Sequence, residues 1–264
     1  MATIKGWFTM NGMHIPIMEG QSRAEAAKKY YASKYGKTVA KLSSKTSAKK
    51  QNKFTDSYES LEKAADLYQD SNSSDLRQSA KDFYDKLGYT NIPTKISNNE
   101  FDKLTQDSKF GALERGYREV NGISTQEMIT QFKNGDLYIG EQRAFGIGTY
   151  FGYGKDAHSI AKEYATYKEE NILKAGITKE AKIITAADLH KRQNEFSFKS
   201  FKKANEISKT KGEDAADAYY NKMNKLIRND DGIFAAALGY DAIDIPDAGY
   251  IVILNRGKVV INEW

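Results

Sequence analysis

Hydrophobic and polar residues alternate along residues 2–18, a pattern typical of β-strands with one buried face. Asn11-Gly12 interrupts the alternation between the runs at residues 7–10 and 13–17. Asn-Gly favours a two-residue hairpin turn, because both central positions of that turn need a positive φ. The pattern therefore predicts an N-terminal β-hairpin.

From Ser22 to about Leu87 the pattern becomes helical, in a stretch rich in alanine, lysine, tyrosine and serine. Ser22 and Glu25 have the spacing of a capping box, which predicts that a helix begins there. A lysine-rich break at residues 43–53 separates the helical stretches. We interpret it as a solvated linker or helix face, with a contact to phosphate or to an acidic partner as the alternative.

A loop at residues 88–93 ends the helical part, and beyond it short strands alternate with helices. We place a domain boundary there, between a hairpin-plus-helical accessory domain at residues 1–96 and a strand-rich domain at residues 97–264. The expected fold class is α+β. A fragment that begins near Ser97 is expected to fold independently.

Within the second domain, Ser97 and Ser124 are expected to begin helices, because each is followed three residues later by a glutamate. Another helix is predicted at residues 156–168, and one long helix or two over residues 199–228. Short apolar runs predict strands at residues 242–245, 250–254 and 258–261. A turn at residues 255–257 would join the last two strands as a hairpin.

The composition, 40% hydrophobic and 28% charged, is ordinary for a globular protein. The chain has no cysteine, which excludes disulfides, thiolate zinc sites and a cysteine nucleophile. No apolar run approaches the roughly 18 residues of a membrane span, and no signal peptide is evident, so no membrane partner is expected. The net charge of +5 allows attraction to nucleic acid or acidic proteins without requiring it.

Two glycine-containing motifs of the second domain carry most of the functional information. The first is Leu113-Glu114-Arg115-Gly116-Tyr117, in which the arginine can hold a phosphate and the glycine lets the backbone approach it. The second, at residues 146–152, reads Gly-Ile-Gly-Thr-Tyr-Phe-Gly and can present a hydroxyl and an aromatic ring at the lip of a cleft. A helix-like run that ends at residues 163–165 follows it.

In this order and at this spacing, the motifs resemble the NAD-binding crevice of the ADP-ribosyltransferase superfamily, in the branch whose motifs read arginine, Ser/Thr and glutamate. The second motif is also similar to a segment of the poly-ADP-ribose polymerase branch. The resemblance covers about residues 105–264 and implies a split β-sheet core with flanking helices, including a strand at residues 136–140 before the second motif. Residues 238–256 resemble the closing strands of bacteriophage-encoded members, and residues 7–17 resemble the start of many phage structural and head-associated proteins.

The resemblance implies roles for individual residues. Arg115 would hold a phosphate of NAD, which a planar guanidinium suits better than a lysine. Thr149 would orient the nicotinamide ribose and the catalytic acid, and Tyr150 or Tyr153 would stack on the nicotinamide ring. The implied NAD-binding residues are Arg115, Gly116, Tyr117, Gly148, Thr149, Tyr150, Phe151 and Tyr153. The alternatives are a surface ion pair for Arg115 and core packing for the aromatic rings. Tyr164 is expected to be a core residue on the inner face of its helix.

The catalytic acid departs from the family pattern. The family places a glutamate at the start of a late strand, where it stabilises the positive charge that develops on the ribose as nicotinamide leaves. That position aligns with Gly249, and Asp247-Ala248-Gly249 stands where Glu-x-Glu would be expected. Asp247 would substitute, with Asp244 a poorer choice, so the implied catalytic residues are Arg115, Thr149 and Asp247.

Other chemistries have weaker support in the sequence. The three histidines, His14, His158 and His190, lack the spacing of metal ligands, and no metal site is expected. The glycines of the second motif are not followed by the third glycine of a dinucleotide-binding turn or by a Walker lysine. Residues 229–232 lack the spaced ligands of a calcium loop and are read as a turn.

Three hypotheses follow. The first is a phage-type mono-ADP-ribosyltransferase that uses NAD to modify a host or phage protein, with the N-terminal part choosing the target. The second is the same fold without catalysis, acting by binding, for example as an inhibitor of a host defence protein. The third is a virion-associated structural protein. The expected location is the cytoplasm of an infected bacterial host or the virion, and nucleic acid is a less favoured partner.

Overall fold

The computed structural model describes residues 4–10, 13–18, 54–69, 76–120, 122–135 and 145–262. The chain divides into two compact units, residues 1–50 and residues 51–264. In the first unit, β1 (Ile4–Met10) pairs antiparallel with β2 (Met13–Met18), and Met10 is opposite Met13. This pairing confirms the predicted hairpin. The helix expected from Ser22 and the lysine-rich break lie outside the described residues.

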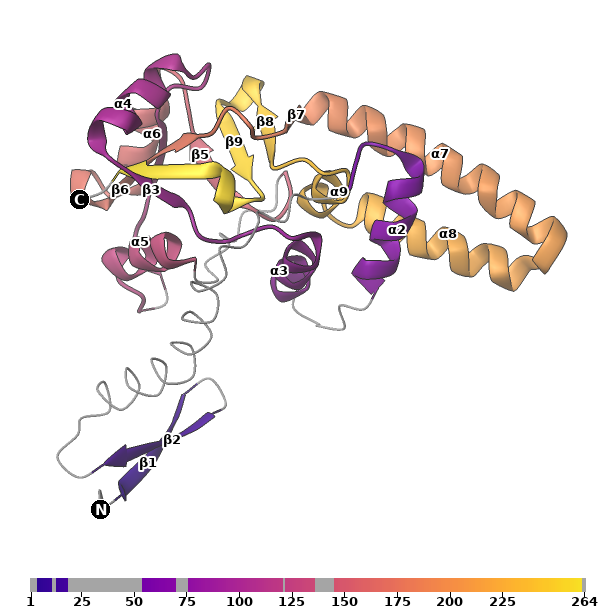
Figure 1. Cartoon of the computed structure of the whole chain (residues 1–264), viewed down its shortest axis with the longest axis horizontal. Coiled ribbons are helices and arrows are strands. Elements are labelled where there is room, and N and C mark those ends of the chain that lie inside the picture. The colour runs from indigo at the N-terminus through magenta and orange to yellow at the C-terminus, as the bar shows by residue number, and fades with distance from the viewer. Residues whose placement is uncertain are drawn as a thin grey trace. The chain divides into compact units, whose positions relative to one another are not determined.

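The second unit is built on a mixed sheet that, within the described residues, has eight strands (Figure 1). In spatial order the strands are β3 (Thr94–Ile96), β10 (Val259–Asn262), β6 (Ile172–Ile177), β4 (Leu113–Gly116), β5 (Thr149–Gly152), β9 (Tyr250–Ile253), β8 (Ala242–Ile245) and β7 (Ile183–Thr185). Only the two edge pairs, β3 with β10 and β7 with β8, are parallel; the other described pairs are antiparallel. Helices and strands in one unit confirm the α+β expectation.

Alternate residues of the central strands enter two separate hydrophobic cores. Ile243 and Val252 belong to one core, whereas Ala242 and Ile251 belong to the other. Because successive side chains of a strand point to opposite faces, the two cores lie on the two faces of the sheet. Each face of the sheet is therefore covered.

The first core is covered by five helices. They are α2 (Tyr58–Gln69), α3 (Leu76–Leu87), α7 (Ala186–Lys211), α8 (Glu213–Arg228) and α9 (Asp231–Ala237). Leu61 of α2, Phe83 of α3 and Phe234 of α9 are fully buried in it. Helices α2 and α3 thus pack against α8 and α9, which come from the far end of the chain. The structure assigns them to the same unit as the sheet and divides the chain near residue 50, whereas the sequence suggested a boundary at residue 96.

Three further helices lie nearer the β3 end of the sheet than the β7 end: α4 (Asn98–Asp107), α5 (Thr125–Asn134) and α6 (Ala157–Tyr164). Ser97 and Glu100 form a capping box at the start of α4, and the Ser124 hydroxyl accepts a hydrogen bond from the Glu127 backbone at the start of α5. Both predicted helix starts are confirmed. The helix predicted at residues 156–168 ends at Tyr164.

The region predicted as one helix or two is a pair, α7 and α8, which begins earlier than expected and is divided at Gly212. The predicted strands at residues 242–245, 250–254 and 258–261 are confirmed as β8, β9 and β10. Their predicted hairpin is wrong, because β9 is already flanked by β5 and β8, and β10 pairs with β3 and β6. Short 3-10 turns, η1 (Glu169–Asn171), η2 (Pro246–Ala248) and η3 (Arg256–Lys258), complete this unit. The strand expected at residues 136–140 lies outside the described residues.

Candidate functional site

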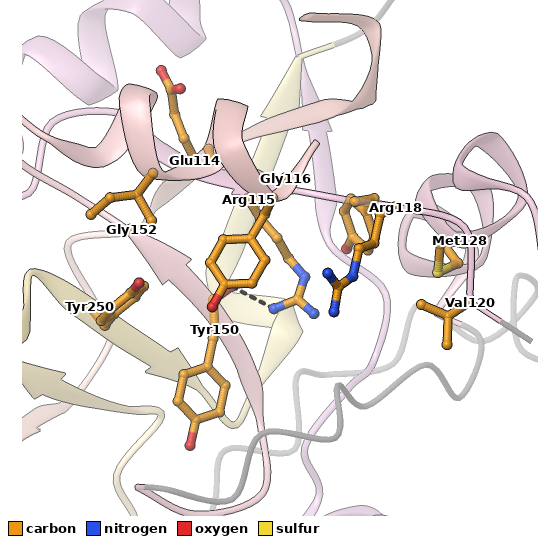
Figure 2. Close-up of a pocket in the computed structure, with 13 residues that line it drawn as sticks. Glu114, Arg115, Gly116, Arg118, Val120, Met128, Tyr150, Gly152 and Tyr250 are labelled. Carbon is orange, nitrogen blue, oxygen red and sulfur yellow. Dashed lines mark hydrogen bonds between the residues drawn. The ribbon is translucent and has the colours of Figure 1, made fainter. Parts of the chain in front are cut away.

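A cavity of about 230 Å³ lies where β4 and β5, which carry the two sequence motifs, meet β9 (Figure 2). Its walls come from β4 and the residues after it, from β5, from the first residue of β9, from one side of α6 and from Met128 of α5. In the sheet register, Glu114 of β4 is opposite Gly152 of β5, which is opposite Tyr250 of β9. Segments more than a hundred residues apart in sequence thus meet at one site.

Arg115 is half-buried beside this cavity, and the described residues accept hydrogen bonds from only some of its N–H groups. Its Nη1 donates a hydrogen bond of 2.7 Å to the backbone oxygen of Tyr150, and its guanidinium lies 5.0 Å from the centre of the Tyr117 ring. Its buried Nε has no hydrogen-bond partner among the described residues. No described carboxylate forms an ion pair with it, so the geometry leaves N–H donors for an anion.

A second guanidinium, that of the exposed Arg118, lines the same cavity, and Figure 2 shows it extending toward the same region as Arg115. Two arginines in one cavity suit an anion with more than one charge, because each can offer paired N–H donors. Arg118 was not among the site residues predicted from the sequence. Its position three residues after Arg115, just beyond the strand, was the available signal.

Tyr150 is a fixed wall of the cavity. Its hydroxyl donates to the backbone oxygen of Gly146 at 2.8 Å and accepts from the backbone nitrogen of Phe145 at 3.0 Å. Burial raises the pKa of Tyr150 to about 12, so the phenol stays neutral at physiological pH. The ring position is therefore set by the loop that carries the second motif.

Tyr164 also lines the cavity and is 43% exposed, so its prediction as a core residue is wrong. The buried face of α6 is formed instead by small residues, Ala157 and Ala161, which lie close to β5 and β4. The reason for this close packing is Gly116, where a Cβ would overlap the carbonyl oxygen of Ala161. Tyr250, at the start of β9, adds another aromatic wall, and burial raises its pKa.

Not all predicted NAD-binding residues lie at the cavity. Arg115, Gly116, Tyr117 and Tyr150 line it, whereas Gly148, Thr149, Phe151 and Tyr153 do not. Thr149 is buried in the sheet, where its Oγ1 accepts a hydrogen bond of 3.3 Å from Nε of Arg256. Phe151 packs edge-on against Phe132 in the second hydrophobic core, on the face of the sheet opposite the core that contains Tyr150.

Tyr153 and the carboxylates near the start of β9 form a separate cluster. The Tyr153 hydroxyl donates a hydrogen bond of 2.6 Å to the buried carboxylate of Asp244, which also lies 3.5 Å from the ammonium of Lys109. Burial, then the bond to Asp244, raises the pKa of Tyr153. Asp247 is exposed in η2 and does not line the cavity. Gly249 has a left-handed φ of 65°, which suits a glycine better than a side chain.

Glu114 is the one carboxylate among the described cavity-lining residues, and its charge is engaged elsewhere. Its Oε2 lies 2.6 Å from Nδ1 of His158, and its Oε1 lies 3.6 Å from Nζ of Lys174. Figure 2 shows its carboxylate pointing away from Arg115 and Arg118. Glu114 therefore connects β4 to α6 and β6, and no described carboxylate points at the two guanidinium groups.

The charged contacts of His158 and Lys162 in α6 extend to Glu169. Its Oε1 lies 3.4 Å from Nε2 of His158 and 2.7 Å from Nζ of Lys162. The ammonium of Lys162 lowers the pKa of Glu169. The described residues contain no group of three or more histidine, cysteine, aspartate or glutamate side chains that could hold a metal ion. Among the described helices, none combines the length and apolarity that crossing a membrane requires.

The cavity thus offers two guanidinium groups, several tyrosine rings and a glycine-backed strand. These groups can bind a ligand that has both phosphate and a flat aromatic ring. Comparison with known protein families, curated proteins and solved structures found no match to this chain.

Proposed function

We propose that the cavity binds NAD in the manner of the ADP-ribosyltransferases that the two motifs resemble. The single observation that carries this proposal is the meeting of Arg115 and Tyr150 at one cavity, on adjacent strands and joined by a hydrogen bond of 2.7 Å. A random surface arginine has no reason to lie beside the turn that completes the family motif. The family's crevice needs these two segments to be neighbours.

The contents of the cavity support a division of labour. Arg115 and Arg118 would hold the pyrophosphate through charge-assisted hydrogen bonds. Tyr150 and Tyr164 would flank the nicotinamide ring, and the backbone of Gly116 would lie against it. A volume of about 230 Å³ is below the roughly 300–1,000 Å³ typical of pockets for drug-sized ligands. The cavity would therefore enclose the nicotinamide-ribose half of NAD and leave the adenosine outside.

Two forms of this function differ in chemistry. In the transferase form, ADP-ribose passes to a host or phage protein, and a carboxylate must stabilise the ribose cation as nicotinamide leaves. In the binding form, NAD or ADP-ribose is held without reaction. The specific observation that favours the binding form is the outward-facing carboxylate of Glu114, together with an exposed Asp247 outside the cavity.

Calorimetry of NAD binding to the full chain tests the shared proposal. We expect wild type to bind NAD and Arg115→Ala to bind at least about tenfold more weakly. Arg228→Ala removes an exposed arginine at the end of α8 and is the matched control, expected to bind as wild type. Equal affinity of wild type and Arg115→Ala, or no binding by wild type, contradicts the proposal. Release of nicotinamide then distinguishes the transferase form from the binding form.

A further inference from the structure

The outward side of α7 carries two aromatic rings that are more than half exposed. The buried residues of α7, namely Leu189, Phe196, Ser200 and Ala204, recur at helical spacing and define one face. Phe198 and Phe201 fall outside that face and are 59% and 52% exposed. Single exposed hydrophobic residues are ordinary, but two large rings three positions apart share one side of a helix.

Lysines border these two rings. The ammonium of Lys202 lies 4.5 Å from the centre of the Phe198 ring, and Lys191 and Lys209 lie on the same side of α7 by helical spacing. All three lysines are exposed and form no ion pair with a described residue. We call Lys191, Phe198, Phe201, Lys202 and Lys209 the α7 stripe.

Acidic side chains of α7 lie along one edge of this stripe by helical spacing, because Asp188 and Glu195 stand three and four positions from Lys191. Glu195 is paired with Arg192 at 2.9 Å, and Glu206 stands on the flank next to Lys202 and Lys203 by helical spacing. Asn194 and Asn205, both exposed, occupy the remaining positions along the stripe. The stripe thus combines positive charge, amide groups and aromatic rings, with the carboxylates of α7 along one edge.

The stripe is long and accessible. From Lys191 to Lys209 it covers 18 helical steps, or about 27 Å. Figure 1 shows α7 and α8 side by side, extending beyond the sheet as a helical arm. The ring of Phe201 also meets Tyr220 of α8 edge-on, with ring centres 6.5 Å apart, which widens the aromatic area.

From this arrangement we infer that the α7 stripe binds single-stranded nucleic acid. Spaced lysines match the regular negative charge of a phosphate backbone, and exposed rings can stack on unpaired bases, whose flat faces are available in a single strand. An anionic membrane is less suitable because only two adjacent rings are apolar and the opposite face of α7 is buried in the protein. The stripe belongs to α7, which contributes no described residue to the NAD cavity, so this inference does not depend on the proposed function.

Fluorescence anisotropy with labelled oligothymidylate of about 16 nucleotides tests this inference on the full chain. We expect binding by wild type that weakens roughly twentyfold between 50 and 200 mM salt, as three phosphate contacts require. Replacing both rings, Phe198→Ala with Phe201→Ala, should weaken binding about thirtyfold, or about fivefold per stacked ring. Lys202→Ala should reduce the magnitude of the slope of log affinity against log salt by about 0.7.

Two control variants match these changes. Ile92→Ala removes an exposed apolar side chain, 58% exposed, outside α7, and Lys103→Ala removes an exposed lysine of α4. Both should bind the oligonucleotide as wild type does. Because the stripe side chains are exposed, the variants should keep the wild-type unfolding midpoint, which circular dichroism checks.

Three outcomes would overturn the inference. One is no binding of the oligonucleotide by wild type. Another is binding that the α7 variants do not weaken more than the controls. The third is equal or tighter binding of duplex DNA, polyglutamate or phosphatidylserine vesicles through the same side chains, which would assign the stripe to a different anionic partner.

Discussion

Arg115 of β4 donates a hydrogen bond of 2.7 Å to the backbone oxygen of Tyr150 in β5. This bond holds the guanidinium against the backbone of β5, while the buried Nε remains without a partner among the described residues. The cation and the aromatic wall of the cavity are therefore positioned together. A substitution at Arg115 should therefore also affect the position of Tyr150.

Replacing Arg115 tests its part in NAD binding. Arg115→Ala should weaken NAD binding by about 1.5–3 kcal/mol, or roughly ten- to a hundredfold, because charge-assisted hydrogen bonds are lost. Arg115→Lys should recover little of this affinity, because an ammonium cannot hold Tyr150 and a phosphate with one planar fork. Calorimetry measures both variants, and a lysine variant with full affinity would show that charge alone is sufficient.

Gly116 and Gly152 form a matched pair for testing how closely α6 packs on the sheet. A Cβ at Gly116 would overlap the backbone of Ala161, so Gly116→Ala should lower the free energy of unfolding by about 1–3 kcal/mol or more. At Gly152 the nearest atom, Cα of Ala157, would be 3.4 Å away, and Gly152→Ala should cost much less. Urea denaturation compares the two variants. Equal stabilities would contradict the close approach of α6 to β4.

The fold was predictable where the signal is local. The turn signal of the hairpin and the capping residues Ser97 and Ser124 act over a few positions, and the structure confirms the strand pairing and both helix starts. Strand pairing depends on partners far along the chain, which explains why the turn at residues 255–257 was misread as a hairpin. Local periodicity likewise cannot tell that α2 and α3 complete a core whose other half comes from residues 147–254.

The candidate site was predictable in its motifs but not in its side-chain directions. Arg115, Gly116 and Tyr150 were found because residue type and spacing carry them. Tyr164 was misjudged because the small residues of α6, not its large ones, face the sheet. Thr149 faces the opposite side of the sheet from its neighbour Tyr150, because successive side chains of a strand alternate. Which of the two residues faces the cavity becomes clear only from the strand pairing.

Helices α2 and α3 lead to a prediction about fragments. A fragment of residues 97–264 lacks Leu61 and Phe83, which are fully buried, and should therefore fail to unfold cooperatively. A fragment of residues 51–264 retains the whole contact set of the second unit and should fold. Thermal unfolding followed by circular dichroism compares them. Cooperative unfolding of the shorter fragment would restore the boundary suggested by the sequence.

The end of α6 stores backbone strain beside the cavity. Thr166 and Tyr167 have positive φ values of 52° and 64°, although neither is glycine. Thr166→Asn should raise the free energy of unfolding by about 1 kcal/mol, because asparagine tolerates this conformation better than a β-branched residue. Thr210→Asn, in the helical backbone of α7, is the control and should bring no gain. Denaturant unfolding measures both, and a loss of stability in Thr166→Asn would contradict the strain.

Asp247 decides between the two forms of the proposed function. It lies exposed in η2, outside the cavity, so in the binding form Asp247→Asn should leave NAD affinity unchanged, and wild type should release no nicotinamide.

In the transferase form, Asp247 is the acid that replaces the missing glutamate. The amide would then remove the charge while keeping the shape, and turnover should fall at least about a hundredfold with little change in binding. Nicotinamide release, measured with and without host lysate, separates these results. Wild-type turnover that Asp247→Asn retains in full would place the acid on another residue, and we expect instead that no turnover is found.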